Sequence, residues 1–173
     1  DPIMTAGPGH LVALVNTTIR MWGKSGGAPL FSQTTGGFFT GVPNCGDPFD
    51  VFVDYDEQND RYVLGGMTLS GSSSFICIAA TQTGDPTTLW NRYSFRSDAI
   101  LTSASGDYPH MGIGLHAVYI GMNMFDDAAG TFDSARLFAV SKAAMYAGTA
   151  IQVAEFGVAG FRTAQPARIR GFN

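Results

Sequence analysis

Four polar residues near two Asp-Pro motifs could form a binding site: Asp47, Asp50, Asp107 and His110. The motif that begins at Asp47 is Asp-Pro, the motif that begins at Asp107 is Asp-Tyr-Pro, and each precedes a short apolar run typical of a strand. If these strands line a common channel, the carboxylates and the imidazole ring one mouth of it and could bind a polyol or a cation. The alternative is that Asp47 and Asp107 cap the turns before the prolines, as Asp commonly does.

Glycoside hydrolysis would need two carboxyl groups roughly 5 to 9.5 Å apart. The sequence has only two glutamates, of which Glu57 lies in a tight turn and Glu155 follows a predicted strand. The carboxylates Asp54, Asp56 and Asp60 flank a predicted hairpin, where Asp usually hydrogen-bonds its own backbone. A calcium loop at this hairpin would lack the Gly and the terminal Glu of a standard loop. The sequence therefore predicts no catalytic residues.

Metal and cofactor sites are not expected either. His110 and His116, placed on one extended strand, would stand roughly 20 Å apart, too far to share a metal ion. No nucleophile elbow and no phosphate-binding glycine loop is present. Sialidase chemistry would need three arginines around a carboxylate, and the sequence does not place three together. The candidate arginines for this role are Arg20, Arg61, Arg92, Arg96 and Arg136.

The composition favours an all-β protein with many turns. The 173 residues include 22 Gly and 13 Phe, and only 14% are charged. A net charge of −4 argues against nucleic acid as a partner, because nucleic-acid binding needs a basic face. The longest apolar runs are far shorter than the roughly 20 residues of a membrane helix, so no membrane partner is expected.

Two cysteines, Cys45 and Cys77, fall in the same predicted unit. In a reducing compartment they would be two buried thiols, and in a secreted protein they would form a disulfide. They lack the spacing of a zinc or redox site. We expect the disulfide. Asn16 begins a glycosylation sequon, Asn-Thr-Thr in a predicted turn, and its modification depends on the source of the protein.

Short apolar runs between Gly, Asn, Asp, Ser and Pro clusters predict four-stranded antiparallel meanders, repeated along the chain. Asp-Pro or Asp-Tyr-Pro openings at positions 1, 47 and 107 delimit units of the length and strand number of a β-propeller blade. We predict a single partial propeller domain with blades at 1–44, 45–105 and 106–160 and a lead-in to a further blade at 161–173. The alternative is a β-sandwich, which also uses short, regularly spaced strands.

Several motifs resemble a family of secreted, largely uncharacterised microbial β-propeller proteins with sialidase-like blades. They are Gly46-Asp-Pro48, Asp54-Tyr-Asp, Asp60-Arg-Tyr62, Cys77-Ile-Ala, Thr83-Gly-Asp-Pro-Thr87, Asp107-Tyr-Pro109 and the segment 137–148. The run from Thr83 to Trp90 is also similar to the structural hairpin of sialidase blades, with Thr87 and Leu89 replacing the usual Gly and Thr. The resemblance covers about the N-terminal half of the usual domain and implies a propeller fold and an extracellular location.

These observations favour a secreted, non-catalytic propeller that acts as a binding or assembly module at the cell surface or in the extracellular matrix. The alternative is a glycan-active, sialidase-like hydrolase or lyase whose catalytic residues lie partly outside this segment. Three blades cannot close a ring, so both end faces need a cover. The expected partners are the remaining blades of a longer parent chain or a second copy, with carbohydrate as a further candidate ligand.

Overall fold

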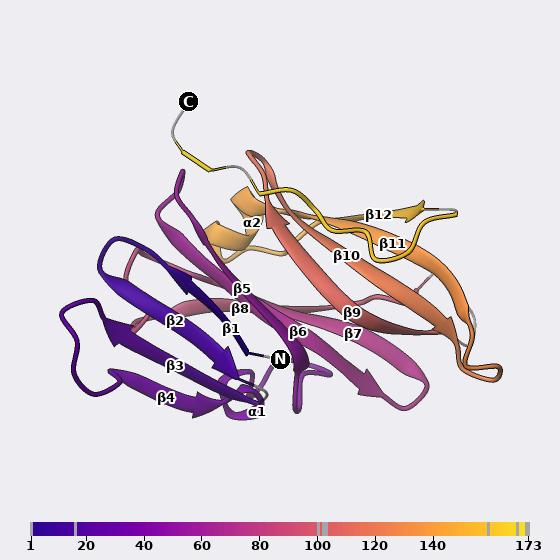
Figure 1. Ribbon diagram of the computed structural model, residues 1–173, viewed down its shortest axis with the longest axis horizontal. Helices are drawn as coiled ribbons and strands as arrows, with labels where there is room; N and C mark the ends of the chain where they lie inside the picture. The colour runs from indigo at the N-terminus through magenta and orange to yellow at the C-terminus, as the bar shows by residue number, and fades with distance from the viewer. Residues whose placement is uncertain are drawn as a thin grey trace.

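The computed structural model describes residues 2–15, 17–99, 101, 104–158, 160–168 and 170–171. The fold is all-β and consists of three four-stranded antiparallel sheets, in which the strands follow one another in sequence order (Figure 1). The predicted fold class, an array of about three four-stranded blades, is confirmed. The described residues do not close into a ring.

The first sheet contains β1 (Pro2–Ala6), β2 (His10–Val15), β3 (Thr18–Gly23) and β4 (Phe31–Thr34), followed by the short helix α1 (Thr35–Phe38). The second contains β5 (Phe49–Asp56), β6 (Arg61–Ser70), β7 (Ser73–Thr81) and β8 (Trp90–Arg96). The third contains β9 (Ala104–Ile113), β10 (Ala117–Asp126), β11 (Phe132–Ser141) and β12 (Val153–Val158), with helix α2 (Lys142–Ala147) between its last two strands. The strands of the three sheets span residues 2–34, 49–96 and 104–158.

The first strand of each sheet lies on the inner side of the stack. β5 packs between β1 and β9, so these three strands are neighbours in space although they belong to three different sheets. β1, β5 and β9 are each paired on one edge only, with β2, β6 and β10. This arrangement of inner strands is that of propeller blades around a channel.

Alternation of side chains along the strands builds two apolar layers. The layer between the first and second sheets contains Val12, Leu14, Ile19, Met21, Val53, Leu64 and Ala79. The layer between the second and third sheets contains Val63, Ile76, Ile78, Ile120, Met122, Met124 and Phe138. The second sheet is buried on both faces, which explains why β6 and β7 are nearly continuous apolar runs rather than alternating ones.

The outer faces of the first and third sheets are not covered by another sheet. On the first sheet, Met4 is 65% exposed and Val15 is 48% exposed. On the third sheet, Phe156 is 56% exposed and Tyr119 is 39% exposed. A single sheet has two faces to bury, and the stack leaves one such face at each end.

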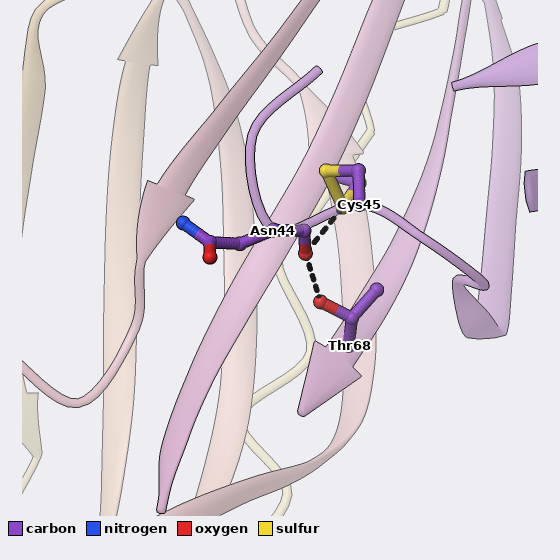
Figure 2. The surroundings of a disulfide bond; sticks show 4 residues. Asn44, Cys45 and Thr68 are labelled. Atoms are coloured by element: carbon purple, nitrogen blue, oxygen red, sulfur yellow. Dashed lines mark hydrogen bonds between the residues drawn. A yellow bond between two sulfur atoms is a disulfide. The ribbon is translucent and has the colours of Figure 1, made fainter. Parts of the chain in front are cut away.

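Cys45 and Cys77 form the predicted disulfide, so the alternative of two free thiols does not apply. Their Cα atoms are 5.9 Å apart, and the bond joins the segment before β5 to the middle of β7 within the second sheet. The carbonyl oxygen of the neighbouring Asn44 accepts a hydrogen bond from the hydroxyl of Thr68 on β6 (Figure 2). The disulfide and this hydrogen bond fix the entry of the chain into the second sheet.

Side chains of β8 hold both helices against the second sheet. The Arg92 guanidinium donates to the carbonyl oxygen of Phe38, the last residue of α1. Asn91 donates to the carbonyl oxygen of Met145 over 3.1 Å, and the Tyr93 hydroxyl donates to the same carbonyl over 3.0 Å. Since Met145 lies in α2, one edge strand donates hydrogen bonds to carbonyl groups near the ends of two helices from two different sheets. Among the described residues, no helix has the length and apolar character to cross a membrane.

Candidate functional site

A cavity of about 170 Å³ opens beside the inner strands. Its walls come from all three sheets and from the C-terminal segment, through Pro2, Ile3, Asp50, Val51, Phe52, Tyr108, Pro109, His110, Met111 and Arg168. We call it the channel cavity. Two of the four residues predicted to form a site, Asp50 and His110, line it directly.

A β-bulge in each of two neighbouring inner strands shapes the channel cavity. The β5–β6 register shifts between Phe49 and Phe52, and Asp50 at this shift has a φ of 46°. The β9–β10 register also shifts, and Tyr108 on β9 has a φ of 56°. Asp tolerates the left-handed region, whereas a bulky side chain rarely adopts it. Bulges at corresponding positions of two strands redirect the side chains that follow, and both lie at the cavity.

The carboxyl group of Asp50 has the carboxyl group of Asp107 as a neighbour, because β5 packs against β9. Burial raises the pKa of Asp50, and the nearby negative charge of Asp107 raises it further, while the backbone N–H of Tyr108 opposes these effects. Burial and a like charge both disfavour the ionised form of a carboxyl group. This environment favours the protonated form of Asp50, which can both donate and accept a hydrogen bond.

His110 completes the polar side of the channel cavity. Its ring packs edge-to-face on Tyr108, with ring centroids 4.3 Å apart. Burial lowers the pKa of His110, and the nearby charge of Arg168 lowers it further, so the ring is neutral at pH 7. Its Nε2 atom is buried and has no hydrogen-bond partner among the residues that the structure describes. A neutral imidazole with an unsatisfied nitrogen favours a ligand that can donate or accept one hydrogen bond.

Asp47 does not line the channel cavity. Its Oδ1 atom accepts a hydrogen bond from Thr35 over 3.5 Å, next to α1 of the first sheet. It lines a separate hollow together with Asn44, Gly46, Phe49, Thr68, Leu69 and Ser70. The structure thus brings Asp50, Asp107 and His110 together and leaves Asp47 at the sheet junction. Asn16, the predicted sequon, lies outside the described residues.

The acidic residues outside the channel cavity have structural partners. Asp54 and Asp56 are buried and hydrogen-bond the backbone of their own hairpin, at Tyr55 and at Gln58 respectively. Glu155 faces Arg136 at 3.6 Å, and burial raises the pKa of Glu155. In the part of the chain that the structure describes, no three His, Cys, Asp or Glu side chains converge in a way that could hold a metal ion.

Two residues that line the channel cavity, Tyr108 and Arg168, were not predicted as site residues from the sequence. Tyr108 could have been found from its position between Asp107 and a proline, in one of the three Asp-Pro or Asp-Tyr-Pro openings. For Arg168 the sequence gives no signal, because this residue reaches the cavity only through the path of the C-terminal segment across the third sheet.

Comparisons of the chain with protein-family models, with curated proteins and with solved structures found no match.

Proposed function

We propose that the chain is a non-catalytic binding module of β-propeller type, and that its channel cavity binds hydroxyl groups of a carbohydrate or another polyol. The observation that carries this proposal is the meeting of Asp50, Asp107 and His110, which come from two different sheets, beside one cavity. The cavity of about 170 Å³ is smaller than a typical small-molecule site of roughly 300 to 1,000 Å³. It therefore admits one edge of a sugar ring rather than an entire oligosaccharide.

The chemistry of the cavity fits a neutral, hydroxyl-bearing ligand. The Asp50 carboxyl group, whose protonated form is favoured by burial, can donate to one hydroxyl group and accept from another. Neutral His110 offers a buried nitrogen that lacks a partner among the described residues. Tyr108, which is 46% exposed, provides an aromatic surface next to these groups. Hydroxyl groups satisfy all of these requirements without bringing a charge into the cavity.

An extracellular location belongs to the same proposal. The Cys45–Cys77 disulfide supports it, because disulfides persist mainly in oxidising compartments. The resemblance to secreted microbial propellers points in the same direction. The outer face of the first sheet, which no other sheet covers, and the apolar side chains that stay exposed on the third sheet support an assembly role, with further blades of a longer chain or a second copy as the partners.

The alternative function, a sialidase-like hydrolase or lyase, receives less support. The candidate arginines are dispersed over different partners. Arg92 binds the Phe38 carbonyl group, Arg96 binds Asp98, and Arg136 faces Glu155.

A glycan array followed by calorimetry on the hits tests the proposal. We expect binding that His110→Ala weakens by about tenfold or more, since loss of one buried hydrogen bond is worth roughly 1 to 3 kcal/mol. His116→Ala is the matched control, because His116 is exposed and lies outside the channel cavity. A panel of chromogenic glycosides should show no turnover. Absence of any polyol binding, or equal affinity of both variants, would refute the proposal, and turnover abolished by Asp50→Asn would favour the hydrolase.

A further inference from the structure

The C-terminal segment crosses the outer face of the third sheet as an extended chain. We call residues 160–168 with 170 and 171 the strap, and none of these residues is in a helix or a strand. In Figure 1 the strap is the yellow trace that passes over β10 and β11 on its way to the C-terminus. It begins at Gly160, whose φ of 75° turns the chain back after β12.

The third sheet has glycines where the backbone of the strap approaches. A side chain at Gly121 on β10 would collide with the carbonyl oxygen of Ala164. A side chain at Gly112 on β9 would collide with the carbonyl oxygen of Ala167. Only glycine permits so close an approach of one backbone to another. The face is therefore shaped to receive the strap along two adjacent strands.

A reciprocal pair of hydrogen bonds fixes the register of the strap. The side-chain oxygen of Asn123 accepts from the backbone N–H of Thr163 over 2.6 Å. The side-chain nitrogen of Asn123 donates to the hydroxyl of Thr163 over 3.2 Å. Asn123 is buried in β10, so the strap satisfies both polar ends of an amide that would otherwise be unpaired.

Ion pairs attach the C-terminal end of the strap to the second sheet. Arg168 Nε lies 3.2 Å from Asp54 Oδ2, and Arg170 lies 3.1 Å from Asp54 Oδ1 and 3.3 Å from Glu57 Oε1. The backbone N–H of Gly171 also donates to Glu57, over 2.8 Å. The side chain of Asp54 is only 2% exposed, so the two arginines neutralise a carboxylate that has little access to water. This electrostatic latch ties the strap to β5 of the second sheet.

Arg168 has a second role, because its side chain also forms part of the wall of the channel cavity. Its charge is one of the two causes that lower the pKa of His110 in that cavity. Arg170, in contrast, takes part in the latch and does not line the cavity.

We propose that the strap is a latched lid of the channel cavity: its attachment to Asp54 and Glu57 holds Arg168 in the cavity wall. Release of the latch opens the cavity on that side and removes a positive charge from beside His110. The lid itself requires no ligand, and only its effect on affinity rests on the proposed function.

Asp54→Asn in the full chain tests this coupling, because Asp54 pairs with both Arg168 and Arg170. The test has two readouts that need no ligand. Hydrogen exchange at the Thr163 amide should accelerate on the order of tenfold or more, since charge-assisted pairs to a buried carboxylate are lost. In an NMR titration the pKa of His110 should rise toward its ordinary value of 6.5, because Arg168 moves away. High salt should act in the same direction on the wild-type chain.

Arg20→Ala is the control, because Arg20 is an exposed arginine of β3 in the first sheet, and it should change neither readout. Arg170→Ala, which leaves the Arg168–Asp54 pair in place, is a second and milder unlatching variant, and slow exchange at the buried Leu64 amide verifies that each variant remains folded. Unchanged Thr163 exchange in both unlatching variants would overturn the latch. In Asp54→Asn, faster Thr163 exchange with an unchanged pKa of His110 would overturn the coupling to the cavity, without bearing on whether the cavity binds polyols.

Discussion

The Nζ atom of Lys142 lies 2.7 Å from Oδ2 of Asp56, and both side chains are almost completely buried. Lys142 begins α2 of the third sheet, whereas Asp56 ends β5 of the second. The Tyr146 hydroxyl donates to the same carboxylate oxygen over 2.6 Å, and Lys142 also donates to the Gly114 carbonyl oxygen over 2.8 Å. Burial, together with the hydrogen bond to Asp56, raises the pKa of Tyr146, so Tyr146 remains a donor. A buried and fully paired ionic network therefore joins two sheets.

Lys142→Met should reduce the free energy of unfolding by about 3 to 5 kcal/mol, because it leaves the buried carboxylate of Asp56 without its cation. Urea denaturation monitored by tryptophan fluorescence measures the change. Lys24→Met, in an exposed turn, is the matched control and should stay within roughly 0.5 kcal/mol of wild type. Adding Asp56→Asn to Lys142→Met should recover part of the loss, and a double variant less stable than the single one would contradict this role of the ion pair.

Asp50→Asn should stabilise the protein at pH 7 and have no effect near pH 3. The pKa of Asp50 is raised in the folded state above its ordinary value of 3.8, so the folded chain binds this proton more tightly than the unfolded chain. The stability linked to Asp50 is therefore complete below pH 3.8 and is lost as the pH rises through the folded-state pKa. Asparagine cannot ionise, keeps an acceptor for the Tyr108 N–H and tolerates a positive φ.

Thermal melts of wild type and Asp50→Asn between pH 3 and pH 7 check this prediction through the difference in Tm. Asp127→Asn, in an exposed turn, is the control for the Asp-to-Asn exchange itself. A lower Tm of Asp50→Asn at pH 7 would mean that the ionised carboxylate is stabilising and that the pKa of Asp50 is not raised in the folded state.

The strand pattern predicted the fold because each sheet is local in sequence. Every strand pairs with its neighbour along the chain, so turn residues and apolar runs between Phe49 and Arg96 were sufficient to identify a complete sheet. The candidate site was harder to predict because it depends on contacts between sheets. Asp50 and Asp107 meet only because β5 and β9 are neighbours and both carry bulges. Asp47 is just three residues from Asp50, yet it faces α1, and sequence spacing alone cannot show that difference.

Gly65→Ala should destabilise the fold by about 1 to 3 kcal/mol, since a methyl group at this position of β6 has no room. It would collide with the carbonyl oxygen of Cys77 and come within 2.6 Å of the Phe52 ring. Gly9→Ala is the control, because a methyl group at Gly9 would have no neighbour within 4 Å. The free energy of unfolding from urea denaturation distinguishes the two, and similar values for both variants would show that the second sheet can relax around Gly65.

Replacing Tyr108 with Gly should relieve backbone strain, whereas replacing Tyr119 with Gly should destabilise the backbone. The two tyrosines are similarly exposed, at 46% and 39%. Tyr108 has a φ of 56°, a conformation that costs a bulky residue on the order of 1 to 2 kcal/mol and that glycine adopts freely. Tyr119 lies in a regularly paired part of β10, where glycine costs roughly 0.5 to 1 kcal/mol. We therefore expect Tyr108→Gly to be the more stable variant by about 1.5 to 3 kcal/mol, the sum of the strain relieved at Tyr108 and the cost of glycine at Tyr119, as measured by urea denaturation. Tyr108→Gly should also weaken polyol binding, because it removes the aromatic wall of the channel cavity. A Tyr108→Gly variant that loses as much stability as Tyr119→Gly would show that the ring contact with His110 outweighs the backbone strain at this bulge.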